Sequence, residues 1–315
     1  MILMLVARRI LIAVFTLLLV SLVVFSITSL LPGDAAQELL GQSATPEIVA
    51  ELREQLGLNQ PGHIRYLVWL KGLLSGDPGL SMVSDMPVKD IIGQRLPKSL
   101  MLAGLTAAVS VPLALLIGIL SAMYRDSRLD RSLNVVTLSM IAVPEFLVAT
   151  IAVIVFAVQL RWLPSITIVP PDASFGELAR AFAMPVMTLC FVVVAQMARM
   201  TRAAVINQLD SPYVEMAILK GARPTRIALR HAFPNAIGPI VNAIALSLSY
   251  LLGGAIIVET IFNYPGVASL MVNAVTSRDM PLLQACAMIF SGAYLIMVLV
   301  ADIVAIVSNP KLRHR

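Results

Sequence analysis

The sequence predicts an all-α integral membrane protein with six transmembrane helices, and three observations support this fold class. Hydrophobic residues make up 58% of the 315-residue chain, and charged residues only 13%, about half the share in an ordinary soluble domain. Mean hydropathy is +0.88, so the apolar side chains are too many for one soluble core. They also gather in long runs, at about 10–31, 99–123, 133–160, 182–200, 236–258 and 285–307.

The first run begins at Ile10, directly after Arg8 and Arg9. A cleavable signal peptide is the competing interpretation. At about 22 residues, however, the run is too long for such a peptide, and no small-residue cleavage site follows it. We therefore interpret it as a retained transmembrane helix.

Residues 32–97 carry many charges together with several Pro and Gly, which predicts a small extracytoplasmic region. Within it, the triplet 45–47 (Thr-Pro-Glu) is typical of a helix start: a capping hydroxyl, a first-turn proline and a first-turn acid. Gly57 can close that helix. A second amphipathic segment is expected at 64–74.

The later runs add two expectations. The run at 133–160 is long enough to tilt, or to kink at Pro144, and the polar stretch 259–284 predicts a short re-entrant or interfacial helix after Pro265-Gly266. No Gly/Ser linker divides the chain, so residues 1–315 are expected to form a single transmembrane domain. Cys190 and Cys286 both lie in apolar runs without CxxC spacing, which indicates buried, unreactive thiols.

The positive charges predict the topology. The net charge is +5, and the basic residues flank the apolar runs, so they indicate orientation in the membrane and not nucleic-acid binding. With the N-terminus inside, the inner segments hold 14 of the 23 Lys and Arg residues and four acids, while the outer segments hold twelve acids. Both termini are therefore expected in the cytoplasm.

In this topology the polar interval from Ser211 to Pro234, within a loop at about 203–235, faces the cytoplasm. Ser211 can cap a helix whose first turn contains Pro212, and Gly221 suits the left-handed residue after its end. We expect a helix at 212–220 and a second helical piece leading back to the membrane. The alternative is an ordinary loop that is rich in arginine only for topology.

The interval is similar to the signature loop of binding-protein-dependent ABC importer permeases, E-A-A-x3-G-x9-I-x-L-P. The signature's Glu, second Ala, Gly and Pro are matched by Glu215, Ala217, Gly221 and Pro234, whereas Met216, His231 and Phe233 depart from it. Three further stretches resemble the dipeptide/oligopeptide/nickel subfamily, in its first-permease branch: LPGDAA at 31–36, and those at 52–81 and 259–284. The ending SNPKLR is a looser match, because Asn309 replaces the subfamily's acid.

This resemblance implies the type I ABC importer permease fold and a division of labour. Such a permease pairs with a second permease subunit, two cytoplasmic ATP-binding subunits and an extracytoplasmic solute-binding protein in the bacterial inner membrane. The chain would need no cofactor, since ATP and Mg would bind the partner ATPases. The residues implied in coupling to an ATPase are Tyr213, Glu215, Met216, Ala217, Lys220, Gly221, Ala222, Arg223 and Pro234.

Other classes fit less well. No GxxxxGK[ST] loop, HExxH or GxSxG motif occurs, which argues against an ATPase or an intramembrane protease. A secondary transporter would need intramembrane charges; the candidates are Glu145, which could face the translocation pathway, and Asp302, for which a helix-end or interhelical contact is the simpler reading. Short peptides are the favoured solute of the implied importer, with nickel, glutathione or opine-like solutes as alternatives.

Overall fold

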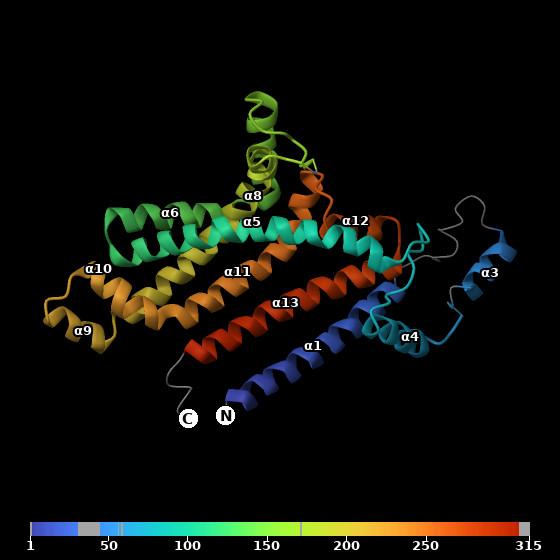
Figure 1. The fold of residues 1–315 in the computed structure, drawn as a ribbon, viewed down its shortest axis with the longest axis horizontal. Helices are drawn as coiled ribbons and strands as arrows, with labels where there is room; N and C mark the ends of the chain where they lie inside the picture. The colour runs from blue at the N-terminus through green and yellow to red at the C-terminus, as the bar shows by residue number, and fades with distance from the viewer. Residues whose placement is uncertain (1, 31–44, 56, 58, 171, 309–315) are drawn as a thin grey trace. The chain divides into compact units, whose positions relative to one another are not determined.

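The computed structural model describes residues 2–30, 45–55, 57, 59–170 and 172–308. The stretches at 31–36 and 309–313, which carried part of the family resemblance, lie outside the described residues. The described part is mostly helical and contains no β-strand (Figure 1). The elements that form its candidate membrane spans are α1 (Ile2–Leu30), α5 (Val88–Met123), α6 (Arg128–Ala142), α7 (Glu145–Ala152), η2 (Val153–Gln159), α8 (Phe175–Leu209), α11 (Phe233–Ile261) and α13 (Met280–Ser308).

Five of the described helices are long and apolar enough to cross a membrane, and the bent pair Arg128–Ala142 and Glu145–Gln159 makes up to six. This confirms the predicted number of spans. Several helices continue past the apolar runs, because polar residues can extend a helix into the water on either side of the lipid: α5 begins at Val88 and α8 covers Phe175–Leu209. At 36 residues, α5 is about 54 Å long, well beyond the roughly 30 Å of hydrocarbon.

The third span is broken at Pro144, as its sequence allowed. Its two halves meet at 95°. Val143 has the extended backbone (φ −86°, ψ 125°) that a following proline favours, and Pro144 has no N–H to continue the first helix. The second half, α7, therefore starts afresh with Glu145 in its first turn.

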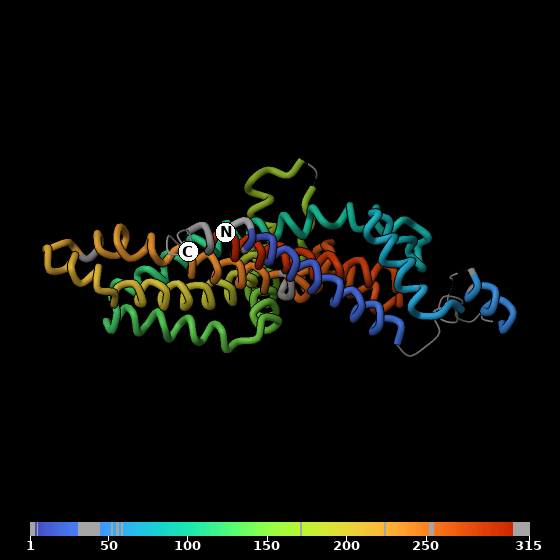
Figure 2. The backbone as a smooth tube through the Cα atoms, turned by 90° about the horizontal axis from the view of Figure 1, so that it is seen from below, coloured from blue at the N-terminus to red at the C-terminus, as the bar shows by residue number. Residues whose placement is uncertain are grey.

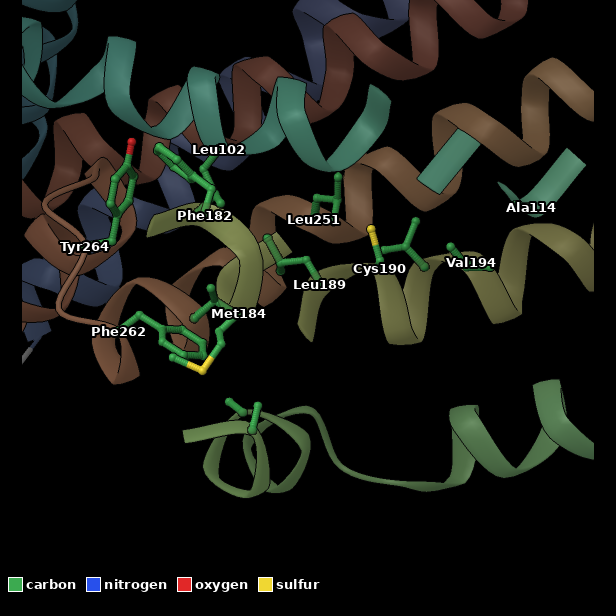
Figure 3. Close-up of a cluster of buried hydrophobic side chains, with 14 of the residues drawn as sticks. Leu102, Ala114, Phe182, Met184, Leu189, Cys190, Val194, Leu251, Phe262 and Tyr264 are labelled. Atoms are coloured by element: carbon green, nitrogen blue, oxygen red, sulfur yellow. The ribbon is translucent and has the colours of Figure 1, made fainter. Parts of the chain in front are cut away.

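The structure divides into two compact units. One holds residues 100–264 with the ends of the chain, and its core gathers around α8 and α11 (Figure 3). Phe182, Met184 and Leu189 of α8 pack there with Leu251 of α11, and Tyr264 meets the Phe182 ring edge-on at 5.5 Å.

The other unit holds residues 11–99 and 265–293. Three short helices belong to it: α3 (Pro46–Gln55), α4 (Gly62–Leu74) and α12 (Val267–Thr276). The predicted helix starts and ends are confirmed at α3, where the Thr45 hydroxyl accepts from the Ile48 N–H and Gly57 has φ +63°. Helix α12 confirms the short helix expected after Pro265-Gly266.

Asp279 connects two segments of this second unit by hydrogen bonds. Its carboxylate, 1% exposed as a residue, accepts hydrogen bonds from the Ser81 hydroxyl and from the backbone N–H groups of Met82 and Leu282. The loop before α5 is thereby attached to the start of α13. The cysteines Cys190 and Cys286 are free and buried, as the sequence predicted.

Helices α5 and α8 approach each other closely at Gly118. A Cβ atom at this position would lie 2.6 Å from the Ala198 carbonyl oxygen and 2.7 Å from the Thr201 Cβ. Small residues allow such backbone contact between membrane helices.

We expect Gly118→Ala to lower the unfolding free energy by about 1–3 kcal/mol, because the added methyl group forces α5 and α8 apart. Thermal unfolding of the purified protein measures this loss. Gly104→Ala is the matched control on the same helix, where a Cβ meets nothing within 4 Å, and its melting temperature should not fall. Equal effects of the two substitutions would contradict the close approach.

Candidate functional site

A short helix, α9 (Pro212–Leu219), lies between the spans α8 and α11 at the position predicted for it (Figure 2). Its first turn is closed by the Val214 and Glu215 N–H groups, which donate to the Ser211 carbonyl at 3.0 and 3.2 Å. The Ser211 hydroxyl does not cap the helix as its sequence suggested; it donates instead to the Gln208 carbonyl at the end of α8. The Ser211 side chain thus joins α9 to the end of α8, and only the Ser211 carbonyl takes part in the first turn of α9.

The end of α9 depends on Gly221, as predicted. Its φ of +75° is in the left-handed region that favours glycine. The Ala222 N–H donates to the Ala217 carbonyl at 3.1 Å and the Gly221 N–H to the Ile218 carbonyl at 2.8 Å, which is a Schellman ending. Ala217, Gly221 and Ala222 therefore set where the helix stops and which way the chain leaves.

One face of α9 is anchored and the other is open. Val214 is 1% exposed and packs inward with half-buried Ala217, where α9 contacts the returning segment η3 (Ile227–Ala232). Around the rest of the helix, large apolar side chains face the surroundings: Tyr213, Met216, Ile218 and Leu219, exposed by 41, 55, 56 and 75%. Sequence reasoning missed Val214, Ile218 and Leu219, although the spacing of Val214 and Ala217 marks an inward face.

The charged members of the predicted set are exposed beside these apolar side chains. Glu215 is exposed in the first turn of α9, Lys220 is its exposed C-cap residue, and Arg223 is exposed just beyond. Pro234 is not part of this face: it lies exposed in the first turn of α11. The predicted residues from Tyr213 to Arg223 thus lie together on or beside α9, whereas Pro234 acts at the start of α11.

Pro234 shapes the backbone of the segment that returns from α9 to α11. The chain returns through α10 (Pro224–Arg226) and η3, whose wider turn is closed by the Phe233 N–H donating to the Ala228 carbonyl. Pro234 cannot donate to the residue four positions back and would clash with it in an α-helix. The wide turn accommodates this restriction and lets η3 run directly into α11.

A buried ion pair joins α6 to α8, about two helical turns before α8 ends. Asp130, at the start of α6 and with its side chain 3% exposed, accepts two hydrogen bonds from Arg202 of α8, at 2.8 and 2.7 Å. The same carboxylate accepts from the Ser121 hydroxyl of α5 and the Asp126 N–H. Sequence reasoning assigned these charges only to topology; their pairing needed the fold.

A second ion pair lies at the junction itself. Arg125 donates to both oxygens of Asp210, the last residue before Ser211, at 3.1 Å. Its members are 48% and 62% exposed, so water screens it and it contributes little.

Glu145, the predicted pathway residue, lies elsewhere on α7. It is 7% exposed and shares its buried face with Ala149 and Ala152. Within the described part of the chain no hydrogen bond or ion pair reaches its carboxylate. The other intramembrane acid, Asp302, pairs with Arg9 at 3.0 Å, which is the interhelical contact expected for it.

A groove of about 600 Å³ opens between α5, α6 and α8. Its lining is almost wholly apolar, and no charged side chain of the described residues contributes to it. Such a surface suits contact with apolar groups inside a membrane and lacks the polar groups that orient a hydrophilic solute.

Two family models match this chain. Residues 114–314 match the binding-protein-dependent transport system inner membrane component, and residues 1–103 match the N-terminal part of the corresponding membrane component. The chain is 32% identical to the probable peptide ABC transporter permease protein y4tP of Sinorhizobium fredii, over 98% of both chains. It is 34% identical to the glutathione transport system permease protein GsiC of Escherichia coli K12, over 98% of this chain and 99% of that one.

We expect Arg202→Met to destabilise the protein by about 3–5 kcal/mol, because it leaves the Asp130 carboxylate buried without its partner. Chemical or thermal unfolding of the purified protein checks this. Adding Asp130→Asn to that variant removes the unpaired charge and should recover part of the loss.

Arg125→Met is the control, since it removes an arginine from the exposed pair and should cost at most about 1 kcal/mol. Equal losses of stability in the two arginine variants would contradict the larger contribution expected of the buried pair.

Proposed function

This chain belongs to the family of binding-protein-dependent transport system inner membrane components, as a permease, and on that premise we propose that it forms half of the membrane pathway of an ATP-driven importer for short peptides. The single observation that carries the coupling part of this proposal is the open apolar face of α9. Four large apolar side chains on a helix outside the spans form a surface of the kind that partner proteins cover.

The proposed partner at α9 is a cytoplasmic ATP-binding subunit. A helix laid in a groove uses apolar anchors on one face, and α9 offers Tyr213, Met216 and Leu219, with Glu215 in its first turn and Lys220 at its end. The complete machine would contain two such subunits, which bind ATP and Mg, together with a second permease and an extracytoplasmic solute-binding protein. In the inner membrane, both termini of this chain would lie in the cytoplasm.

Coupling then requires that α9 move as one body with the spans. The contacts of α9 with η3, the Ser211–Gln208 hydrogen bond and the Asp130–Arg202 pair resist local bending. When the ATPases close on nucleotide, a push on α9 would pass to α8 and α11 and change which side of the pathway is open. Nucleotide must favour one of these states for the cycle to work.

Peptides are the favoured solute because one relative is named a peptide permease and another a glutathione permease, and glutathione is itself a tripeptide. Glutathione is therefore the closest alternative. The selectivity would come mainly from the solute-binding protein, so the permease needs only a wide and weakly binding path.

Glu145 is the proposed pathway residue. A buried carboxyl without a hydrogen-bond partner is costly, and such groups in membrane spans mark sites of function. In the broken third span, this charge could meet the ammonium group of a passing peptide when the bundle opens.

We expect Leu219→Asp to reduce binding of the ATP-binding subunit by about 2 kcal/mol, roughly thirtyfold, because a charge replaces the most exposed apolar anchor. Co-purification of the subunits and peptide uptake in vesicles measure the loss. Thr225→Asp, exposed just outside α9, is the control and should assemble normally. Full assembly and uptake with Leu219→Asp would refute the proposed docking face.

We expect Glu145→Gln to lower peptide uptake about tenfold, because the neutral amide would lose the charged hydrogen bond proposed with the ammonium group of the peptide. The amount of assembled transporter should stay unchanged. Uptake of labelled peptide per assembled complex separates the two effects. A variant with unchanged uptake would assign Glu145 to packing alone.

A further inference from the structure

Helix α4 carries large apolar side chains on its outward side as well as its inward one, although His63 and Lys71 are also exposed there. Its inward side chains include Tyr66 and Trp69, which are partly buried. Its outward side chains include Ile64, Leu67, Val68 and Leu74, exposed by 40, 59, 64 and 77%. A helix on a protein surface in water normally presents polar side chains outward, and one that is apolar all round belongs in a core or in lipid.

The contacts of α4 show how deep it lies. Tyr66 shares a hydrogen bond of 2.9 Å with Ser21 of α1, and the centres of the Tyr66 and Trp69 rings lie 5.5 and 5.7 Å from the centre of the Phe25 ring. Ser21 is 1% exposed although it stands in an apolar span. These are α1 residues well inside the run that crosses the membrane.

The rise of an α-helix converts the position of Ser21 in α1 into a distance from the end of that helix. Ser21 stands nine residues before Leu30, where α1 ends, which is about 14 Å along the helix axis. The hydrocarbon region is about 30 Å thick. A helix that touches α1 at Ser21 and Phe25 therefore reaches below the surface of the bilayer and cannot lie wholly in the water outside it.

The few charges on α4 are compatible with that position. The Arg65 guanidinium lies 5.8 Å from the centre of the Phe25 ring, where the ring face attracts a cation. Lys71 is exposed, and its long side chain can extend its ammonium group to the headgroups. Tyr and Trp are also the residues most common at the membrane interface.

We propose that α4 is inserted into the lipid leaflet beside the C-terminal half of α1, with its outward face against acyl chains. The region at 32–97 is then not wholly extracytoplasmic: the chain leaves the membrane after α1, dips back in at 62–74, and leaves again before α5. The occupant of this surface is lipid, because the surface lies beside an apolar span at a depth where lipid is the solvent.

The test places a nitroxide spin label at Val68→Cys, and separately at Leu67→Cys, in the transporter complex purified from cells and reconstituted in lipid nanodiscs. Collision rates with oxygen, which concentrates in lipid, and with a water-soluble nickel chelate report the surroundings of the label. Leu22→Cys, at an exposed position of α1, is the lipid reference, and Glu51→Cys, exposed on α3, is the water reference.

The expected result is an oxygen-to-nickel accessibility ratio at both α4 positions close to that of Leu22→Cys and several-fold above that of Glu51→Cys. A ratio like that of Glu51→Cys would place α4 in water and overturn the proposal. Labels shielded from both reagents would overturn it too, because a protein partner would then cover the face. Unlabelled Cys190 and Cys286 are buried, and the protein without added cysteines sets the background.

Discussion

The buried carboxylate of Asp130 is the contact on which the working geometry depends. It joins the turn between α5 and α6 to Arg202 of α8, and α8 carries α9. Removing a carboxylate from water is favourable only when several donors replace the water, and here a bidentate arginine, a hydroxyl and a backbone N–H do so. This is a geometry-specific contact in a bundle held largely by non-directional apolar packing, and it joins α5 and α6 to α8, the helix that leads into α9.

Close backbone packing completes that rigid base. Gly118 allows α5 to approach α8 at Ala198, next to the helical turn that contributes Arg202. In lipid, apolar side chains gain little from leaving their surroundings, so helices associate through close packing and hydrogen bonds. The open apolar face of α9 is the reverse case: outside the lipid, exposed Met216 and Leu219 gain by being covered. Apolar side chains therefore give little drive for association inside the lipid, but favour binding of a partner outside it.

Local features of the chain were predicted well because they depend on neighbouring residues. Pro212 and Gly221 define α9, Pro144 breaks the third span, and Thr45 starts α3. Each of these acts through backbone conformation or a hydrogen bond within a few positions. Where a local prediction was wrong, as for the Ser211 hydroxyl, the backbone carbonyl of Gln208 at the end of α8 took the hydroxyl as its donor.

The sequence by itself determined the membrane class, the number of spans and the extent of α9, because hydropathy, proline and glycine act over short stretches of chain. Only the tertiary structure decided the partners of Asp130 and Asp302, the inward face of Glu145, and the contact of α4 with Ser21. These depend on residues up to about 290 positions apart in sequence being brought together by packing, and one-dimensional patterns carry no record of which pairs will meet.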